Sequence, residues 1–469
     1  MSEETKAPGI IKIFSSLMLQ KVPSYANKIY YSLGFLSMLS FFVSIVSGLI
    51  EVFYGPAWWL TTTAGVYVRS VHLWAAQAFV LFILLHLIIV FLTSGYKTPR
   101  RLTWVIGALM LFFVLMEAEL GYGLRGDFSS QWRVLQASDL YNGSGLGAFV
   151  NNLNYAQIYG IHIVLIPLII LGLLFVHYLL VKVRGISAPH RTDTAYRMVR
   201  ANHRVLFLRG FILLAVILVL AWAFPSPLIL PKTIQDVAKE DPALVADTLV
   251  KELGHSSDTA TYLDNIDPYS YDTAEVYVHV PYEQLRQVSG SADRWTSLLQ
   301  LSDAARSALI QKADEYFSGG GSLRSYDANQ AIAIASALTG MAQSGLYEAA
   351  LNQQPLGGGD NRTYSTRFLA DTGVMDAKAQ DLKITTDQYG MVREENGGIL
   401  PPGAWWLTPL GVMDHTILAN DVNQDRDGAE IIGLLFLLLV AFPYIPYLNR
   451  LPEKIGLDKF IQKDNGFGK

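Results

Sequence analysis

Six long apolar runs divide this chain, five in its first half and one near its end. The runs cover residues 30–52, 71–93, 104–120, 158–181, 206–224 and 431–448. An α-helix needs about 20 mainly apolar residues to cross the hydrocarbon core of a bilayer. A buried soluble core can imitate one such run, but six with charge-poor interiors favour membrane spans. We therefore expect an all-α membrane protein with six transmembrane helices.

The stretch between the fifth and sixth runs is different in character. Residues 232–428 are polar and contain 14 Lys and Arg against 28 Asp and Glu. Apolar residues recur at helical spacing in segments 297–317 and 329–351, which indicates a large, mainly helical extramembrane insertion. Its net charge near −14 could attract a cationic partner. The simpler interpretation is a charged surface that keeps an exposed domain soluble.

Basic residues set the expected orientation. They cluster at residues 12–28, 97–101, 182–204 and 450–459, which fall on one side of the membrane if every run spans once. Loops rich in Lys and Arg stay in the cytoplasm. We therefore place both termini in the cytoplasm and the insertion on the outer side of a prokaryotic inner membrane. Residues 1–29 contain an amphipathic stretch typical of a helix lying on the membrane surface.

Four of the nine histidines lie inside predicted spans. His72 and His86 are fourteen positions apart in the second span, and His162 and His177 are fifteen apart in the fourth. A separation of fourteen comes within about 40° of whole helical turns, so His72 and His86 share a face about 21 Å apart along the axis. A separation of fifteen overshoots by about 60°, which a local distortion near Pro167 could absorb. A lone intramembrane His often only bonds a neighbouring helix, so the arrangement carries the information.

The spacing predicts two stacked pairs of imidazoles. His72 meets His162 near the outer face and His86 meets His177 near the inner face, because both spans run the same way across the membrane. Each pair suits a low-spin haem. The chain has no Cys, which excludes thiolate iron–sulfur ligands and covalent c-type haem attachment. Two b-type haems are the expected cofactors, and the four His are their expected iron ligands.

Glycines repeat the histidine spacing. Gly34 and Gly48 lie in the first span and Gly107 and Gly121 in the third, each pair fourteen positions apart. A flat macrocycle inside a helix bundle needs close backbone approach, which a missing side chain allows. One such pair could be ordinary small-residue packing, but two pairs with the His spacing favour haem contact.

Arginines near the ends of these spans are further candidates. Arg69 precedes His72 by three positions, and Arg100 and Arg101 lie near the inner face. Each could pair with a haem propionate, and a role in setting topology is equally plausible. His255, His279 and His415 in the insertion lack ligand spacing, and we interpret them as surface residues.

These motifs resemble a known family. RSVHLWAAQAFVLFILLHLIIVFLTSGYKTPRRLTWVIGALML (69–111), VPSYANKIYYSLG (22–34) and HYLLVKVRGISAPH (177–190) resemble the cytochrome b of quinol–cytochrome c and plastoquinol–plastocyanin oxidoreductases. The His spacing of fifteen is similar to the plastoquinol branch. Over about residues 22–187 the resemblance implies a four-helix di-haem bundle. It also implies haem ligation by His72 with His162 and His86 with His177, and quinone or quinol as substrate.

The resemblance weakens beyond residue 187. The family's Pro-Glu-Trp-Tyr motif, whose Glu is assigned to proton removal from quinol, is matched here only by Gly403-Ala404-Trp405-Trp406. Its Leu-Pro-Trp-Asp reads Leu124-Arg125-Gly126-Asp127, and Ser32 stands where the plastoquinol branch has a haem-linking Cys. Asp127, Asp139 and Asp414 are possible replacement bases, although each is better explained as a loop or surface residue. These departures put bifurcated quinol oxidation at the outer face in doubt.

The expected organisation has six parts. They are a surface helix (1–29), a di-haem bundle (30–187), a connector with the fifth span (188–230), the acidic insertion (231–428), the sixth span (429–449) and a cytoplasmic tail (450–469). The leading hypothesis is a cytochrome b subunit moving electrons between quinone and an outer-side redox partner. One alternative is a haem-bearing anchor or docking subunit without quinone turnover, and another is a transporter that uses the buried His as a proton relay.

The resemblance implies partners as well as cofactors. We expect other subunits of a redox complex, a Rieske-type or cytochrome c-type protein among them, together with lipid and quinone. No nucleic acid partner is expected. Assembly as a homodimer stays open.

Overall fold

A computed structural model describes residues 21–187, 196–263, 271–354, 360–393, 400–421 and 424–463. Most of the expected surface helix at residues 1–29 therefore lies outside the described residues. The chain forms two compact units. Unit 1 comprises Met1–Ala118, Ile163–Ser226 and Gly433–Lys469, and unit 2 comprises Glu119–His162 and Pro227–Ile432.

Six helical segments are long and apolar enough to span a membrane, at the positions of the six predicted runs. They are Ile29–Tyr54, Thr63–Leu92, Arg101–Gly123, Tyr155–Arg184, His203–Ala223 and Arg426–Tyr444. Several extend beyond the apolar run because polar residues cap their ends. Thr62, for example, accepts a hydrogen bond from the amide of Gly65 at 3.0 Å, which satisfies a free donor of the first turn. The expected all-α, multi-pass membrane architecture is confirmed.

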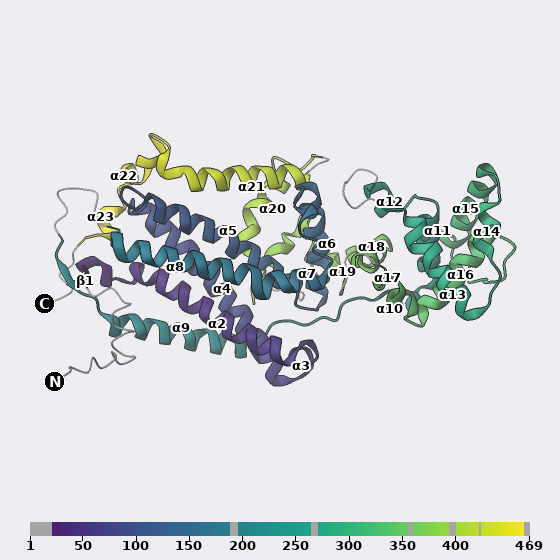
Figure 1. Ribbon diagram of the computed structural model, residues 1–469, viewed down its shortest axis with the longest axis horizontal. Coiled ribbons are helices and arrows are strands. Elements are labelled where there is room, and N and C mark those ends of the chain that lie inside the picture. Colours follow the sequence, from purple (N-terminus) through teal and green to yellow (C-terminus); the bar gives the residue numbers. More distant parts are fainter. Residues whose placement is uncertain are drawn as a thin grey trace, which may run out of the picture. The chain divides into compact units, whose positions relative to one another are not determined.

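Unit 1 consists mainly of the spans (Figure 1). It contains η1 Ser24–Asn27, η2 Ile29–Ser32, α2 Leu33–Tyr54, α3 Pro56–Thr61, α4 Thr63–Leu92, most of α5 Arg101–Gly123, α8 Ile166–Arg184, α9 His203–Ala223 and the C-terminal part of α21 Gln424–Ala441. The strands β1 Lys21–Pro23 and β2 Met198–Arg200 pair antiparallel. The chain ends with η9 Phe442–Tyr444, η10 Leu448–Arg450, α22 Leu451–Ile455 and α23 Asp458–Ile461.

Small buried side chains on the face of α2 toward α4 explain why these two helices pack closely. Ser40, Ser44 and Ser47 are buried there, and Ser40 and Ser44 donate hydrogen bonds to carbonyls one helical turn earlier. The hydroxyls are thus satisfied within their own helix, and the small side chains let the two helices approach. Phe41 stacks on Phe79 of α4 with ring centroids 4.9 Å apart. Large apolar side chains on the outer faces, such as Phe175 and Phe211, are exposed, as expected for contact with lipid.

Unit 2 is built from shorter helices. Its α-helices are α6 Phe128–Gly143, α7 Tyr155–Gly160, α10 Ile234–Glu240, α11 Pro242–Leu253, α12 Asp258–Leu263, α13 Val280–Ser289, α14 Arg294–Leu299, α15 Asp303–Ser318, α16 Gln330–Gln343, α17 Leu346–Asn352, α18 Thr363–Asp371, α19 Val374–Asp381 and α20 Thr408–His415. Shorter turns are η3 Leu146–Ala148, η5 Ala274–His279, η6 Thr386–Gln388, η7 Gly390–Val392 and η8 Trp405–Leu407.

One hydrophobic core holds unit 2 together. Phe128 and Trp132 of α6 pack in the same cluster as Leu249, Leu338 and Phe368 of the insertion. The backbone amide of Phe128 also donates to the carbonyl of Ile229 at 2.8 Å. The insertion therefore shares its core with the loop that joins the third and fourth spans.

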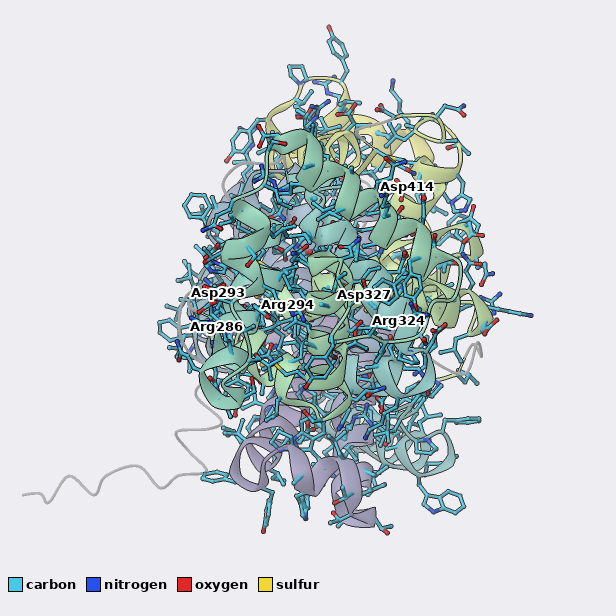
Figure 2. All side chains as sticks on the ribbon, turned by 90° about the vertical axis from the view of Figure 1, so that its right-hand side faces the viewer. Arg286, Asp293, Arg294, Arg324, Asp327 and Asp414 are labelled. Carbon is cyan, nitrogen blue, oxygen red and sulfur yellow. The ribbon has the colours of Figure 1, made fainter. Side chains whose placement is uncertain are left out.

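The surface of unit 2 mixes charges of both signs. Figure 2 shows Arg286, Arg294 and Arg324 with Asp293 and Asp327 on the face turned toward the viewer. Arg286 forms an ion pair with Glu283 at 2.7 Å, and Arg294 donates to the carbonyl of Asp327 at 3.0 Å. The excess of acid on this domain is thus partly paired locally, as on an ordinary solvated surface.

Candidate functional site

Each of the four intramembrane histidines faces one of the four predicted glycines. In unit 1, a methyl group at position 48 would lie 3.0 Å from Cε1 of His72, and one at position 34 would lie 3.3 Å from Cε1 of His86. Both contacts join α2 to α4. Any side chain at these two positions would press on an imidazole ring, so the sequence has glycine there for close approach.

The third and fourth spans repeat the arrangement. In unit 1, a methyl group at position 107 would lie 3.2 Å from Cε1 of His177. In unit 2, one at position 121 would lie 2.9 Å from Cε1 of His162, which is closer than carbon atoms pack. The sequence-predicted glycines and histidines are therefore brought together one to one.

Hydrogen bonds orient the ring of His72. Its Nδ1 lies 3.0 Å from the carbonyl oxygen of Ser44 and 3.1 Å from the hydroxyl of Ser47. A carbonyl can only accept, so this geometry assigns the proton to Nδ1. Nε2 then keeps the lone pair that an iron ion needs, and a second hydrogen bond on the other ring nitrogen is the usual support for a metal-binding His.

The inner histidines both belong to unit 1. His86 of α4 and His177 of α8 are close enough to interact electrostatically. His72 lies in unit 1 and His162 in unit 2. Each of the four donors is an imidazole backed by a glycine, which fits a flat macrocycle with His ligands.

The distortion predicted near Pro167 is present. Residues Ile161–Leu165 form a π-helical turn, η4, and α8 begins at Ile166 with Pro167 in its first turn. A π turn accommodates one more residue than the α-helix it interrupts. The fifteen positions from His162 to His177 therefore turn the helix like fourteen regular ones, which matches the His72 to His86 separation.

The arginines proposed for propionate contact already have protein partners. Arg100 donates from Nη2 to the carbonyl of Ile186 at 2.8 Å and from Nε to that of Gly185 at 3.2 Å. The guanidinium of Arg101 lies 5.2 Å from the ring centroid of Tyr444. Arg69 is 4% exposed, with its guanidinium 5.9 Å from the ring centroid of Trp59. Propionate binding by Arg69 and Arg100 stays a prediction.

Two of the three acids considered as outer-side bases, Asp127 and Asp139, contact other residues of unit 2. Asp127 lies in the loop before α6, as expected, and its side chain is fully buried. It caps α6 by accepting from the amide of Ser130 at 2.9 Å and pairs with Arg125 at 2.8 Å. Asp139 lies 3.7 Å from the guanidinium of the buried Arg367.

The Gly403–Trp406 segment lies beside the end of α5. Tyr122 donates to the carbonyl of Pro402 at 3.2 Å, and its ring centroid is 6.1 Å from that of the buried Trp406. The guanidinium carbon of Arg133, on α6, lies 4.7 Å from the centroid of the Tyr122 ring, and Arg133 also donates to the carbonyl of Arg393 at 2.8 Å. Two segments that lie far apart in the sequence thus meet in unit 2.

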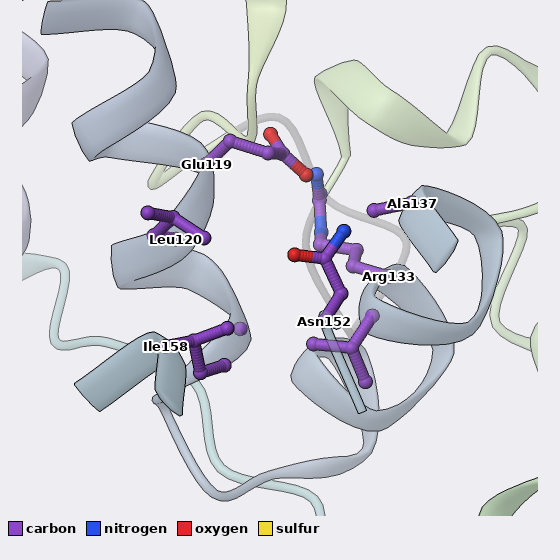
Figure 3. A pocket seen from close by; sticks show the side chains of 8 residues that line it. Glu119, Leu120, Arg133, Ala137, Asn152 and Ile158 are labelled. Carbon is purple, nitrogen blue, oxygen red and sulfur yellow. The ribbon is translucent and has the colours of Figure 1, made fainter. Parts of the chain in front are cut away.

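A buried acid at this place was missed by the sequence analysis. Glu119 of α5 lines a small cavity with Arg133 and Asn152, within unit 2 (Figure 3). A signal was available, because an ionisable residue inside an apolar span is a functional candidate by default. Among the ionisable residues of the spans, only the histidines were predicted to be functional.

The three histidines of the insertion lie beside acidic or aromatic side chains, with Nε2 of His255 3.7 Å from Asp272. His279 stacks on Trp295 at 4.6 Å and bonds Glu275 at 2.7 Å, while His415 stacks on Tyr389 at 4.4 Å. Within the described parts of the chain, no three His, Asp or Glu residues are grouped so as to hold a metal ion.

Spanning helices with glycine-backed histidine sites define a class, the multi-pass helical membrane proteins that hold haem between helices. Comparison with known proteins gives the family. The protein-family model described as "Cytochrome b(N-terminal)/b6/petB" matches residues 77–236 of this chain. Cytochrome b6 of Heliobacterium mobile is 31% identical over 208 residues, which cover 40% of this chain and 98% of that protein. Cytochrome b6 of Gracilaria tenuistipitata var. liui is 30% identical over 190 residues, 36% of this chain and 88% of its own.

The chain belongs to the cytochrome b family. Membership implies haem b binding and a part in electron transport within a quinol-oxidising enzyme complex. Among solved structures, one titled "Hyperthermophilic respiratory Complex III" aligns over 94% of this chain and 97% of its own, with 15% identity and a TM-score of 0.40.

Proposed function

We propose that this chain is the cytochrome b subunit of a membrane quinol oxidoreductase. It moves electrons between the quinone pool and an outer-side redox partner through two b haems. The observation that carries the proposal is that each of the four intramembrane histidines faces a glycine, where an added methyl group would lie 2.9–3.3 Å from the ring. Ordinary helix packing gives no reason for glycine to recur opposite every intramembrane His.

The protein's own residues have defined tasks in this proposal. His86 and His177 hold the inner haem, and His72 and His162 hold the outer one. Ser44 and Ser47 fix the His72 tautomer, so that Nε2 faces the iron. The haems, when bound, supply one-electron carriers spaced to conduct across the bilayer. Spanning helices around them exclude water and so keep the electron on this path.

Orientation and partners follow the distribution of charge. Both termini lie in the cytoplasm of a prokaryotic cell and the acidic insertion faces the outer side, because the basic clusters gather at one end of the spans. A Rieske-type or cytochrome c-type protein accepts electrons there. Arg69 and Arg100 are the residues proposed to hold haem propionates.

The proposal is tested with the complex purified together with its co-purifying subunits. Adding a quinol should reduce the b haems in an inhibitor-sensitive way. Haems that stay oxidised would instead support an anchoring subunit without quinone turnover.

A substitution tests the ligand assignment separately. His86→Leu should leave one haem of two, because the inner iron loses an axial ligand. The same change at His279, which is stacked on Trp295 in the insertion, should leave both. Equal haem content in the two variants would contradict the assignment.

A further inference from the structure

The cavity at the end of α5 brings together two polar groups that lack hydrogen-bond partners. It is lined by Glu119 and Gly123 of α5, Arg133 and Ala137 of α6, and Asn152 and Ile158, among others. Among the described residues, the buried atoms Glu119 Oε2 and Asn152 Nδ2 have no hydrogen-bond partner. Figure 3 shows the Glu119 carboxyl group and the Asn152 amide directed toward the Arg133 guanidinium.

The cavity has the size and polarity of a water site. Its volume of about 10 Å³ is close to the room that one buried water needs. A buried donor or acceptor left without a partner is costly, and a water molecule in the cavity would give both atoms a partner. The water would accept from Asn152 Nδ2 and donate to Glu119 Oε2. A quinone ring does not fit this space.

Arg133 is held in place at the edge of the cavity. Its Nε donates to the hydroxyl of Ser129 at 3.1 Å and its Nη2 to the carbonyl of Arg393 at 2.8 Å. Arg133 and Tyr141, both on α6, are the titratable groups that interact with Glu119. The carboxyl group thus has one fixed positive charge beside it, and its buried Oε2 makes no direct hydrogen bond.

Other acids near this end of α5 are already engaged. Asp127 caps α6 and pairs with Arg125, and Asp139 lies beside Arg367. The segment Gly403–Trp406 carries no carboxylate. Glu119 is the acid that lines this cavity, and its buried Oε2 remains available for proton exchange.

We propose that Glu119 accepts a proton released by quinol oxidation at the outer face, through a water molecule that it shares with Asn152. This proposal rests on the proposed function. Oxidation of a quinol to a quinone releases two electrons and two protons. His72 and His162 would hold the oxidised haem that accepts one electron, and the oxidised outer-side partner would accept the other. One quinol O–H bond breaks, its proton passes to the water, and a proton of that water forms the O–H bond on Glu119. The second proton leaves to outer bulk water.

The activity test compares two glutamates of the same helix. Glu119→Gln in the purified complex should lower quinol turnover by about 100-fold, the usual contribution of a positioned acid–base group, with both haems retained. Glu119→Asp should recover part of the rate, because the carboxylate is kept. Glu117→Gln, two positions away and not lining the cavity, is the matched control and should turn over like the parent.

A spectroscopic test does not depend on turnover. The redox-difference infrared spectrum of the parent should contain a carbonyl band of a carboxylic acid that changes protonation. The band should be absent in Glu119→Gln and present in Glu117→Gln. If Glu119→Gln fails to assemble, Asn152→Leu serves instead, with slowed turnover and retained haems expected.

Each outcome has a distinct meaning. A Glu119→Gln complex that matches the parent rate, or that keeps the infrared band, overturns the role of Glu119 and leaves the proposed function standing. A parent complex whose haems are not reduced by quinol overturns the proposed function instead.

Discussion

At the scale of single residues, the histidines and glycines carry the account because their contacts are too close for any other side chain. A methyl group at position 121 would lie 2.9 Å from Cε1 of His162, so the imidazole ring would have to move to admit it. Both residue types were predictable, since their spacing is visible in the sequence and follows from helical periodicity. Which glycine faces which histidine required the structure.

Gly121→Ala tests this contact. The added methyl group should displace the His162 ring and lower the haem content from two to about one per chain, since close-packed interiors do not absorb such an overlap. Haem is measured by its absorbance per mole of purified chain. Gly172→Ala in α8, where an added methyl group meets nothing within 4 Å, should keep both haems. Equal haem content in the two variants would contradict the role of Gly121 beside His162.

Acidic residues were harder to predict. Asp127 is a loop residue whose burial was not predictable, because its partners are a backbone amide and a neighbouring guanidinium, which leave no periodic signal. Glu119 could have been singled out from its place in an apolar span. Its cavity partner Asn152 could not, because the two belong to separate segments of the chain that only folding brings together.

At the scale of elements, the π-helical turn is the feature that lets the fourth span carry its two histidines. The sequence indicated that a spacing of fifteen needs a correction and that Pro167 was near it. The structure places the correction at Ile161–Leu165. Span positions were also predictable, whereas their ends depended on caps such as Thr62 that a count of apolar residues omits.

Single-residue deletions test the turn. Deleting Val164 should convert the π turn into regular helix and preserve both haems, because the histidines are then fourteen positions apart without distortion. Deleting Leu81 in α4, which contains no π turn, should rotate His86 by about 100° relative to His72 and remove haem. Both side chains are exposed, so their loss alone costs little packing. Haem loss on deletion of Val164 alone would contradict the assignment.

At the scale of the whole molecule, the insertion is more than an appended domain. Its helices share one core with Phe128 and Trp132 of the loop between the third and fourth spans. The sequence predicted a mainly helical insertion at 231–428, but not this shared core, because packing between segments far apart along the chain leaves no local pattern. The same packing brings Gly403–Trp406 to the end of α5.

A buried carboxyl pair makes unit 2 sensitive to pH. Burial raises the pKa of Glu252 to about 10 and also raises the pKa of Asp371. Among the described residues, Glu252 Oε1 and Asp371 Oδ2 have no donor, so a proton on one of them supplies the missing hydrogen bond. The folded unit therefore keeps a proton that the unfolded chain releases above its ordinary pKa of 4.5.

The free energy of unfolding of unit 2 should consequently be greatest at acid pH and fall as pH rises from 4.5 toward about 10. The slope should reach at most about 1.4 kcal/mol per pH unit. The free energy of unfolding at each pH is measured by hydrogen exchange of the α11 and α16 amides, corrected for intrinsic exchange rates. Glu252→Gln should flatten the profile, whereas the exposed Glu315→Gln should not. A flat profile in the parent would refute the shared proton.

The central claim is that two b haems lie between facing histidines, and the most direct measurement is the haem content and spin state of the purified complex. The account predicts two b haems per chain, both low-spin, with two separate midpoints in a redox titration. Finding a single haem, or high-spin iron with one axial His, would contradict it.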